Sequence, residues 1–206
     1  TLTVYMLCTP PPSPGQLNDP INFSIFNAGS NQFLQDVSVN ITNQYTLNKT
    51  YDEPCITGDE TGCYYYIVVY NLPNIELPST PDGYIIAYQR CCRIGGIINV
   101  VGSGSVGNTF TAKIPGTAVL PTAPVNSSPS FLINDTAVVC RNSFFQYSFQ
   151  ATDIDGDSLS YSFCDAYLGA DQGNSSPATT KTHPYLTNNY KTPYSGTLHI
   201  STNVNN

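Results

Sequence analysis

Charged side chains are scarce in this chain, and tryptophan is absent. Only 10% of its 206 residues are charged, whereas ordinary soluble domains contain about 25%. Lys and Arg together number seven against 14 Asp and Glu, which leaves a formal net charge of −7. Binding to a phosphate backbone needs clustered cations, so this composition argues against a nucleic-acid partner.

Long apolar runs are also missing. The longest apolar stretch, CYYYIVVY from Cys63 to Tyr70, is far shorter than the ~20 residues of a membrane-spanning helix. We therefore expect no membrane insertion. The chain begins with TLTVYML, which alternates like a strand and does not have the pattern of a signal peptide. We expect a mature protein or an internal fragment that is truncated at both ends.

Neutral polar residues supply the surface polarity that charges do not. The chain has 22 Thr, 20 Asn and 19 Ser, together with 15 Tyr and 16 Pro. This composition is typical of extracellular all-β proteins. Gly, Pro, Asn and β-branched residues interrupt every candidate helix, so we predict no helix longer than one or two turns.

Alternation of apolar and polar residues with a period of two predicts two β-sandwich units in tandem. In the first unit, residues 1–114, the pattern is clear at 21–26, 37–41, 83–90 and 108–114, and residues 83–90 read as buried on both faces. A Pro-punctuated linker covers 115–129. In the second unit, residues 130–206, alternation at 144–151 and 159–163 precedes a long polar loop over 169–195. These are too few strands for a closed sandwich of ~100 residues, so we expect this unit to be incomplete.

Motifs for catalysis are weak. GSGSVG, Gly102 to Gly107, has the glycine spacing of a dinucleotide site, but a strand pattern follows where such a site needs a helix. We interpret it as a flexible hairpin turn. His183 lies before a proline, and no nucleophile elbow surrounds His199. We therefore expect no enzyme.

The seven cysteines favour disulfides over a metal site, because Cys-x-x-Cys spacing is absent. Cys55 and Cys63 bracket a short acidic loop, and Cys140 and Cys164 flank two strand-like runs, so we predict both pairs as bridges. On a strand, adjacent cysteines point to opposite faces. One of Cys91 and Cys92 is therefore expected to pair with Cys8, and which of the two does so stays open.

Three aspartates stand out in ATDIDGDSLSYSF, which runs from Ala151 to Phe163. Asp153, Asp155 and Asp157 repel one another unless water or a cation screens them. The loop is not an EF-hand, because positions 6 and 12 are Ser158 and Cys164. Two interpretations remain: a calcium site of hard oxygen ligands, which we favour, or a polar turn.

This stretch resembles the corresponding segment of bacterial cadherin-like and immunoglobulin-like repeats. VNSSPSF, from Val125 to Phe131, resembles the segment that opens such repeats. The resemblance implies cadherin-like or Ig-like β-sandwiches. It also implies a calcium ion held at the junction by Asn126, Asp153 and Asp155, to which we add Asp157.

GYIIAYQRCCRIGGIINV, TFTAKIPG, NSSPSF and ATDIDGDSLSYSFCDA together resemble the N-terminal region of large secreted Bacteroidetes surface proteins. Those proteins end in a gliding-motility-associated C-terminal sorting domain and leave the cell by type IX secretion. The resemblance implies an extracellular, non-catalytic structural or adhesive module of a cell-surface protein or filament. Its partners would be neighbouring modules, identical subunits or surface glycans. The alternative, suggested by the abundant Tyr, is a carbohydrate-binding module of a secreted protein.

Overall fold

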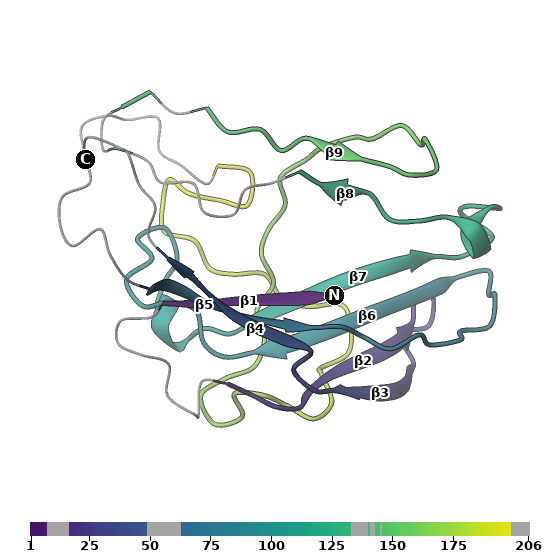
Figure 1. Ribbon diagram of the computed structural model, residues 1–206, viewed down its shortest axis with the longest axis horizontal. Helices are drawn as coiled ribbons and strands as arrows, with labels where there is room; N and C mark the ends of the chain where they lie inside the picture. The colour runs from purple at the N-terminus through teal and green to yellow at the C-terminus, as the bar shows by residue number, and fades with distance from the viewer. Residues whose placement is uncertain (8–16, 49–62, 133–139, 141–142, 145, 199–206) are drawn as a thin grey trace.

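Two antiparallel β-sheets packed face to face form the body of the protein (Figure 1). The computed structural model describes residues 1–7, 17–48, 63–132, 140, 143–144 and 146–198. Seven strands make the two sheets: β1 (Leu2–Leu7), β2 (Ile21–Asn27), β3 (Phe33–Val39), β4 (Asn43–Asn48), β5 (Cys63–Tyr70), β6 (Gly83–Arg90) and β7 (Asn108–Pro115). The first sheet has the order β1-β5-β4, and the second has the order β3-β2-β6-β7.

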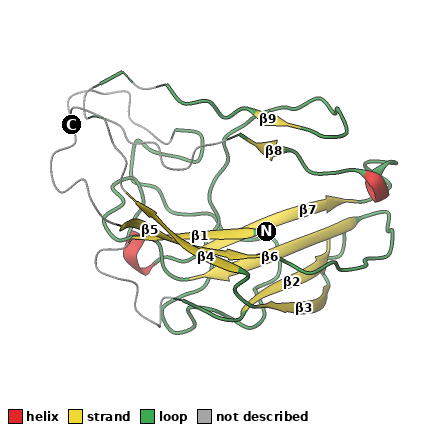
Figure 2. Cartoon of the chain, in the orientation of Figure 1, coloured by secondary structure: helices red, strands yellow, loops and turns green. Residues whose placement is uncertain are grey.

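The all-β fold class predicted from the sequence is confirmed. The helical elements among the described residues are two single 3-10 turns, η2 (Ser103–Ser105) and η3 (Ala123–Val125). The alternating segments expected over 21–26, 37–41, 83–90 and 108–114 correspond to β2, the end of β3, β6 and β7. A further pair of two-residue strands, β8 (Ser130–Phe131) and β9 (Ala151–Thr152), lies beside the sandwich (Figure 2).

The sandwich core lies between the two sheets. Ile21 and Phe23 of β2, Val68 and Tyr70 of β5, and Tyr88 of β6 are buried there. The rings of Phe23 and Tyr88 pack with their centroids 5.6 Å apart. Burying a large apolar side chain contributes about 1.5–3 kcal/mol, so these residues supply much of the stability of the sandwich.

The connection between the sheets decides which strands face each other. β3 ends at Val39 and β4 begins at Asn43 in the other sheet, so three residues cross between them. A link this short places β4 over the β3 side of the four-stranded sheet. Since β1 is at the opposite edge of its sheet, it lies toward β7, as Figure 1 also shows.

Residues 165–198, which we call the strap, cover the central part of the outer face of the four-stranded sheet, over β2 and β6. Tyr185 of the strap packs with Phe26, Ile85 and Ala87 in a second apolar cluster, and Tyr167 packs against it. β6 is therefore buried on both faces, as its sequence predicted.

The expected division into two tandem sandwiches is not confirmed. Beyond residue 129, the described strands are β8 and β9, and much of the expected second unit instead forms the strap on the first sandwich. The segments around 146–150 and 158–164 alternate in sequence but belong to no described strand. The physical reason is that the outer face of β2 and β6 is apolar and offers the strap a surface to bury.

Burial of the outer face by the strap can be tested with two phenylalanines that lie opposite each other on β2 and β3. Phe26 is fully buried, whereas its cross-strand partner Phe33 is 41% exposed. We expect Phe26→Ala to lower the free energy of unfolding by about 3–5 kcal/mol, and Phe33→Ala by about 1 kcal/mol or less. Urea unfolding followed by tyrosine fluorescence measures both. Equal losses would show that the strap does not bury Phe26.

Candidate functional site

The largest concentration of buried polar groups in the described chain lies under the strap. The strap has two arms, joined by hydrogen bonds from the Leu168 amide to the Leu186 carbonyl (2.7 Å) and from the Asn188 amide to the Ala166 carbonyl (2.8 Å). Tyr167 forms bridges both to Thr109 of β7 and to Thr187. The strap is thus attached to the sheet at its edge as well as over its face.

Gln89 is the central polar residue of this attachment. It is only 2% exposed, and both ends of its amide are satisfied. Its Nε2 donates to Thr109 Oγ1 at 2.8 Å, and its Oε1 accepts from the Lys181 amide at 3.0 Å. Thr109 in turn donates to the Leu168 carbonyl. Since an unpaired buried amide costs about 1–3 kcal/mol, the network favours the docked strap over a detached one.

A second polar contact holds the strap at the other side of the sheet. Ser24 on β2 accepts from the Thr180 amide at 2.8 Å and donates to Asp36 Oδ1 on β3 at 2.6 Å. The Thr179 hydroxyl donates to the other oxygen of the same carboxylate. A hydrogen bond to an ionised carboxylate is stronger than a neutral one. Asp36 therefore anchors consecutive strap residues to two strands.

Arg93, just after β6, contacts the far end of both arms. Its Nη2 donates to the Tyr167 carbonyl at 2.9 Å. With its amide oxygen turned toward the guanidinium, Asn188 accepts from Nη2 and Nε at 2.9 and 3.2 Å. Burial lowers the pKa of Arg93 from its ordinary value, but the residue remains a cation at neutral pH. Through these contacts, Arg93 links both arms of the strap to the end of β6.

Two glycines allow the strap to approach the sheet closely. A Cβ on Gly107 would meet the carbonyl oxygen of Ala170, and a Cβ on Gly169 would meet that of Asn108, both at 1.9 Å. The last glycine of the GSGSVG motif, Gly107, therefore lies where the backbone of the strap approaches the backbone that leads into β7. The middle residues of the motif form the turn η2, where Ser103 Oγ accepts from the Ile97 amide at 3.1 Å. The expected flexible hairpin turn is in fact a 3-10 turn that leads into β7.

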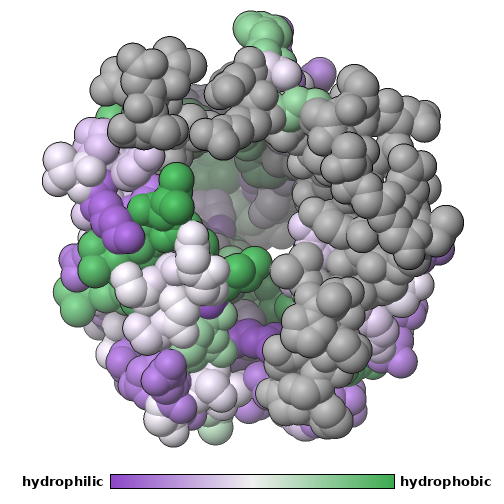
Figure 3. Space-filling view, turned by 90° about the vertical axis from the view of Figure 1, so that its left-hand side faces the viewer, coloured by the Kyte–Doolittle hydropathy of each residue, from purple (hydrophilic) through white to green (hydrophobic). Residues whose placement is uncertain are grey.

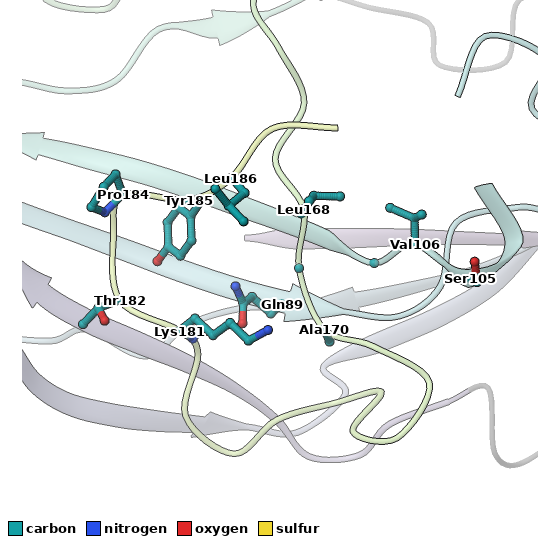
Figure 4. A pocket seen from close by; sticks show the side chains of 12 residues that line it. Gln89, Ser105, Val106, Leu168, Ala170, Lys181, Thr182, Pro184, Tyr185 and Leu186 are labelled. Carbon is teal, nitrogen blue, oxygen red and sulfur yellow. Dashed lines mark hydrogen bonds between the residues drawn. The ribbon is translucent and has the colours of Figure 1, made fainter. Parts of the chain in front are cut away.

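A pocket of about 310 Å³ opens between the two arms of the strap and the end of β6. Figure 4 shows Lys181 and Tyr185 on one arm and Leu168 and Ala170 on the other, with Gln89 between them. Burial raises the pKa of the Tyr185 phenol, and the neighbouring Thr180 hydroxyl partly offsets this rise. The rise in pKa favours the neutral form of the phenol.

Several polar groups in this pocket are engaged in holding the fold, whereas the buried Tyr185 hydroxyl has no hydrogen-bond partner among the described residues. Ser105 donates its hydroxyl to the Gly102 carbonyl at 2.9 Å, and the Gln89 amide bonds to Thr109 and Lys181. His183 lies 3.2 Å from Asn31 Oδ1 and packs edge-on against Tyr185. Neither contact pairs the imidazole with a nucleophile, as general-base activation would require. His199 lies outside the described residues.

The predicted calcium residues lie together only in part. The Ser127 amide, next to Asn126, donates to Asp155 Oδ2 at 2.5 Å, so the linker does reach the aspartate loop. Asn126 itself donates to the Ser127 carbonyl at 2.9 Å. Asp153 Oδ1 accepts from the amides of Asp155 and Asp157 at 2.9 and 3.4 Å, which is the geometry of a polar turn.

Gly156 adopts a φ of +80°, which completes this turn. Across the described part of the chain, no three His, Cys, Asp or Glu side chains gather in a way that could hold a metal ion. Asp153 is half-buried, whereas Asp155 and Asp157 are exposed. The aspartates are thus arranged as a turn whose outer carboxylates face solvent.

The cysteines pair differently from the prediction. Cys164 is free and exposed, whereas Cys140 is disulfide-bonded, so the expected Cys140–Cys164 bridge is not formed. Cys91 and Cys92 are bonded to each other, and neither is bonded to Cys8. The prediction assumed that both lie on a strand, but β6 ends at Arg90. Cys8 and Cys55 lie outside the described residues, as does the side chain of Cys63, so the Cys55–Cys63 pair stays a prediction.

Comparisons of the chain with models of protein families, with curated proteins and with solved structures found no match. Within the residues that the structure describes, there is no helix long and apolar enough to cross a membrane.

The close contact at Gly107 gives a direct test of the strap. We expect Gly107→Ala to displace the strap, because its Cβ would lie 1.9 Å from the Ala170 oxygen, and to make the chain cleavable by trypsin after Lys181. Gly104→Ala is the matched control, since its Cβ would lie 3.4 Å from the nearest atom. Timed digestion followed by mass spectrometry distinguishes them. Equal resistance of both variants would contradict the described contact.

Proposed function

We propose that this chain is a non-catalytic structural or adhesive module of a large extracellular surface protein or filament. The observation that carries the proposal is the use of its buried polar side chains. Ser24, Gln89, Thr109 and Thr180, the buried polar residues of the site, are in contact with the strap or belong to it. The Ser24 and Thr109 hydroxyls and the Gln89 amide, which an enzyme could aim at a substrate, are here engaged in joining distant parts of the chain.

The surface chemistry supports the same role. With 10% charged residues, the polar side chains of the chain are mainly hydroxyl and amide groups. Apolar and hydrophilic residues are interspersed on one end of the molecule (Figure 3). A surface with few charged groups limits the charge repulsion between like modules, so it suits repeated contact with neighbours. The quoted motifs resemble those of secreted Bacteroidetes surface proteins that use type IX secretion, and this resemblance agrees with the proposal.

A carbohydrate-binding module is the second candidate, and one groove favours it. Phe131, Phe149, Tyr161 and Phe163 line a groove of about 760 Å³, with Ser148, Gln150, Ser160 and Ser162 between them. Tyr161 is 55% exposed and Phe163 is 61% exposed. Exposed rings with neutral hydrogen-bonding groups around them could stack on sugars. Against this, Tyr70, Tyr84, Tyr88 and Tyr185 are buried in the fold.

Two measurements on the same chain separate these functions. Antibodies against the chain should label intact cells that express it, and external protease should remove the label, because the module is exposed outside the cell. On a glycan array, the labelled chain should show no saturable binding. Internal location would overturn the proposal. Saturable glycan binding that Tyr161→Ala abolishes, and Tyr45→Ala on β4 leaves unchanged, would establish the carbohydrate function instead.

Calcium bound at Asp153, Asp155 and Asp157, with help from Asn126, remains part of the proposal. The contact between Ser127 and Asp155 supports it, because a cation there would have ligands on both sides of the linker. The exposed carboxylates of Asp155 and Asp157 can turn toward an ion at little cost, since their side chains are not packed. Such an ion would stiffen the linker, which suits an extended surface protein.

Thermal unfolding with calcium and with chelator tests this site. Calcium at a hundredfold above the dissociation constant should stabilise the chain by about 2.7 kcal/mol, and Asp155→Asn should remove that gain. Asp171→Asn is the control, because Asp171 accepts from the amides of Gly173 and Asn174 in a separate turn. If calcium leaves the melting temperature unchanged, the three aspartates are only a polar turn.

A further inference from the structure

Two adjacent cysteines form a disulfide at the point where β6 ends. Cys91 and Cys92 are bonded to each other, and β6 ends one residue earlier, at Arg90. A disulfide stabilises a fold mainly when it closes a long loop, because it then restricts the unfolded chain. A bond between neighbours closes almost no loop and joins no distant parts of the chain. Its effect is therefore on the local path of the backbone.

The bond excludes one backbone conformation at these two residues. In an extended strand, the side chains of successive residues point to opposite faces. Two neighbours whose sulfurs are joined therefore cannot both be extended. The sequence predicted both Cys91 and Cys92 on a strand, and the disulfide gives the physical reason why β6 ends before them.

The strap is attached to the chain on both sides of this bond. Gln89 Oε1 accepts from a strap amide at 3.0 Å, and the Cys91 amide donates to the Ser175 carbonyl at 2.8 Å. Arg93 Nη2 donates to the Tyr167 carbonyl at 2.9 Å. Residues 89, 91 and 93 thus contact three separate parts of the strap, and the disulfide lies between the first contact and the last.

The two cysteines differ in their access to solvent. Cys92 is exposed, whereas Cys91 is 8% exposed and its amide bonds to the strap. A disulfide is opened by a thiolate that attacks one of its sulfurs and displaces the other. The exposed Cys92 is therefore the point of attack, and Cys91 is the leaving group.

We propose that the Cys91–Cys92 disulfide is a redox-sensitive lock that keeps the strap docked. The reductant is a dithiol, which opens the lock in two exchange steps. Its first thiolate bonds to the Cys92 sulfur and releases Cys91 as a thiolate, which takes up a proton. Its second thiolate then displaces Cys92, which is protonated in turn. The protein gains two electrons and two protons, and the dithiol leaves as a disulfide.

Opening the lock changes the spacing of the strap contacts. Once the bond is broken, Cys91 and Cys92 can extend and prolong β6. Each extended residue advances the chain by about 3.3 Å, which moves Arg93 along the sheet relative to Gln89. The strap contacts on the two sides of the bond then no longer match the strap, and it leaves the outer face. The core between the sheets contains no strap residue, so it stays packed.

The biological role of the lock rests on the proposed extracellular location. Thiols are kept reduced in the cytosol, whereas disulfides form and persist outside the cell. The strap would therefore stay undocked before export and close over β2 and β6 afterwards. The lock thus links the completion of the fold to the compartment in which the module acts.

Limited digestion with trypsin tests the lock on the intact chain. The chain is reduced with dithiothreitol, a dithiol, and separated from it by gel filtration under argon before trypsin is added. We expect cleavage after Lys181 to be at least tenfold faster in the reduced chain than in the oxidised one. Slow cleavage of a chain in which Cys91 and Cys92 are reduced would overturn the lock.

Serine variants show which cysteines are responsible. The double variant Cys91→Ser, Cys92→Ser should be cleaved fast with and without reduction, because it cannot form the bond. Cys164→Ser is the matched control, since Cys164 is free and exposed, and it should respond to reduction as the native chain does. A double variant that resists trypsin until it is reduced would contradict the proposal.

A titration with dithiothreitol keeps the test valid if the double variant does not fold. Alkylation with iodoacetamide and mass spectrometry give the reduced fraction of each cysteine at each concentration. We expect cleavage after Lys181 to follow the reduction of Cys91 and Cys92. Cleavage that follows Cys140, which is also disulfide-bonded, would overturn the lock. None of these results depends on surface labelling or glycan binding, so failure of the lock and failure of the proposed function are distinguishable.

Discussion

Burial of β2 and β6 on both faces is the constraint on which the rest of the structure depends. Their inner faces meet the three-stranded sheet, and their outer faces carry Phe26, Ile85 and Ala87. An apolar outer face left in water would cost about 1.5–3 kcal/mol for each large side chain. The strap removes this cost, and it does so with residues from a part of the chain that is more than a hundred positions away, as in the contact between Ser24 and Thr180.

The strap is polar, so apolar burial alone cannot hold it. Its amides at Thr180 and Lys181 bond to Ser24 and Gln89, which belong to the sheet. Polar side chains on the outer face therefore determine where the strap lies, while Tyr185 supplies the apolar contact. On the inner face of β7, by contrast, Phe110 is 51% exposed and Ile114 is 36% exposed.

Local sequence patterns predicted the strands well and the long-range contacts poorly. The double burial of residues 83–90 followed from apolar residues at both parities of GYIIAYQR, and β6 has that burial. Residues 169–195 were predicted as a loop because their sequence does not alternate between apolar and polar residues. In the structure they bond to side chains on distant strands, and this attachment needs no such alternation. One feature of the sequence did point to a covering segment. Gln89 shares a strand face with Ile85 and Ala87, and a buried amide on that face needs a hydrogen-bond partner from another part of the chain.

The cysteines and aspartates show a second limit of sequence reasoning. Spacing along the chain suggested Cys140–Cys164, but Cys164 is exposed and free, because the stretch around it forms no described strand that would bring it to Cys140. Asp153, Asp155 and Asp157 were predicted as a group, and the turn that they form was the other interpretation of the same pattern. The structure describes the turn, and calcium binding by the same residues stays a proposal.

Hydrogen exchange of the strap amides is the most direct test of this account. If the strap completes the fold, the amides of Thr180 and Lys181 should exchange as slowly as the central amides of β6, because all of them open only on global unfolding. Exchange can be followed residue by residue by NMR on the intact chain. Rapid exchange at Thr180 and Lys181, with β6 still protected, would contradict the claim that the strap is part of the folded core.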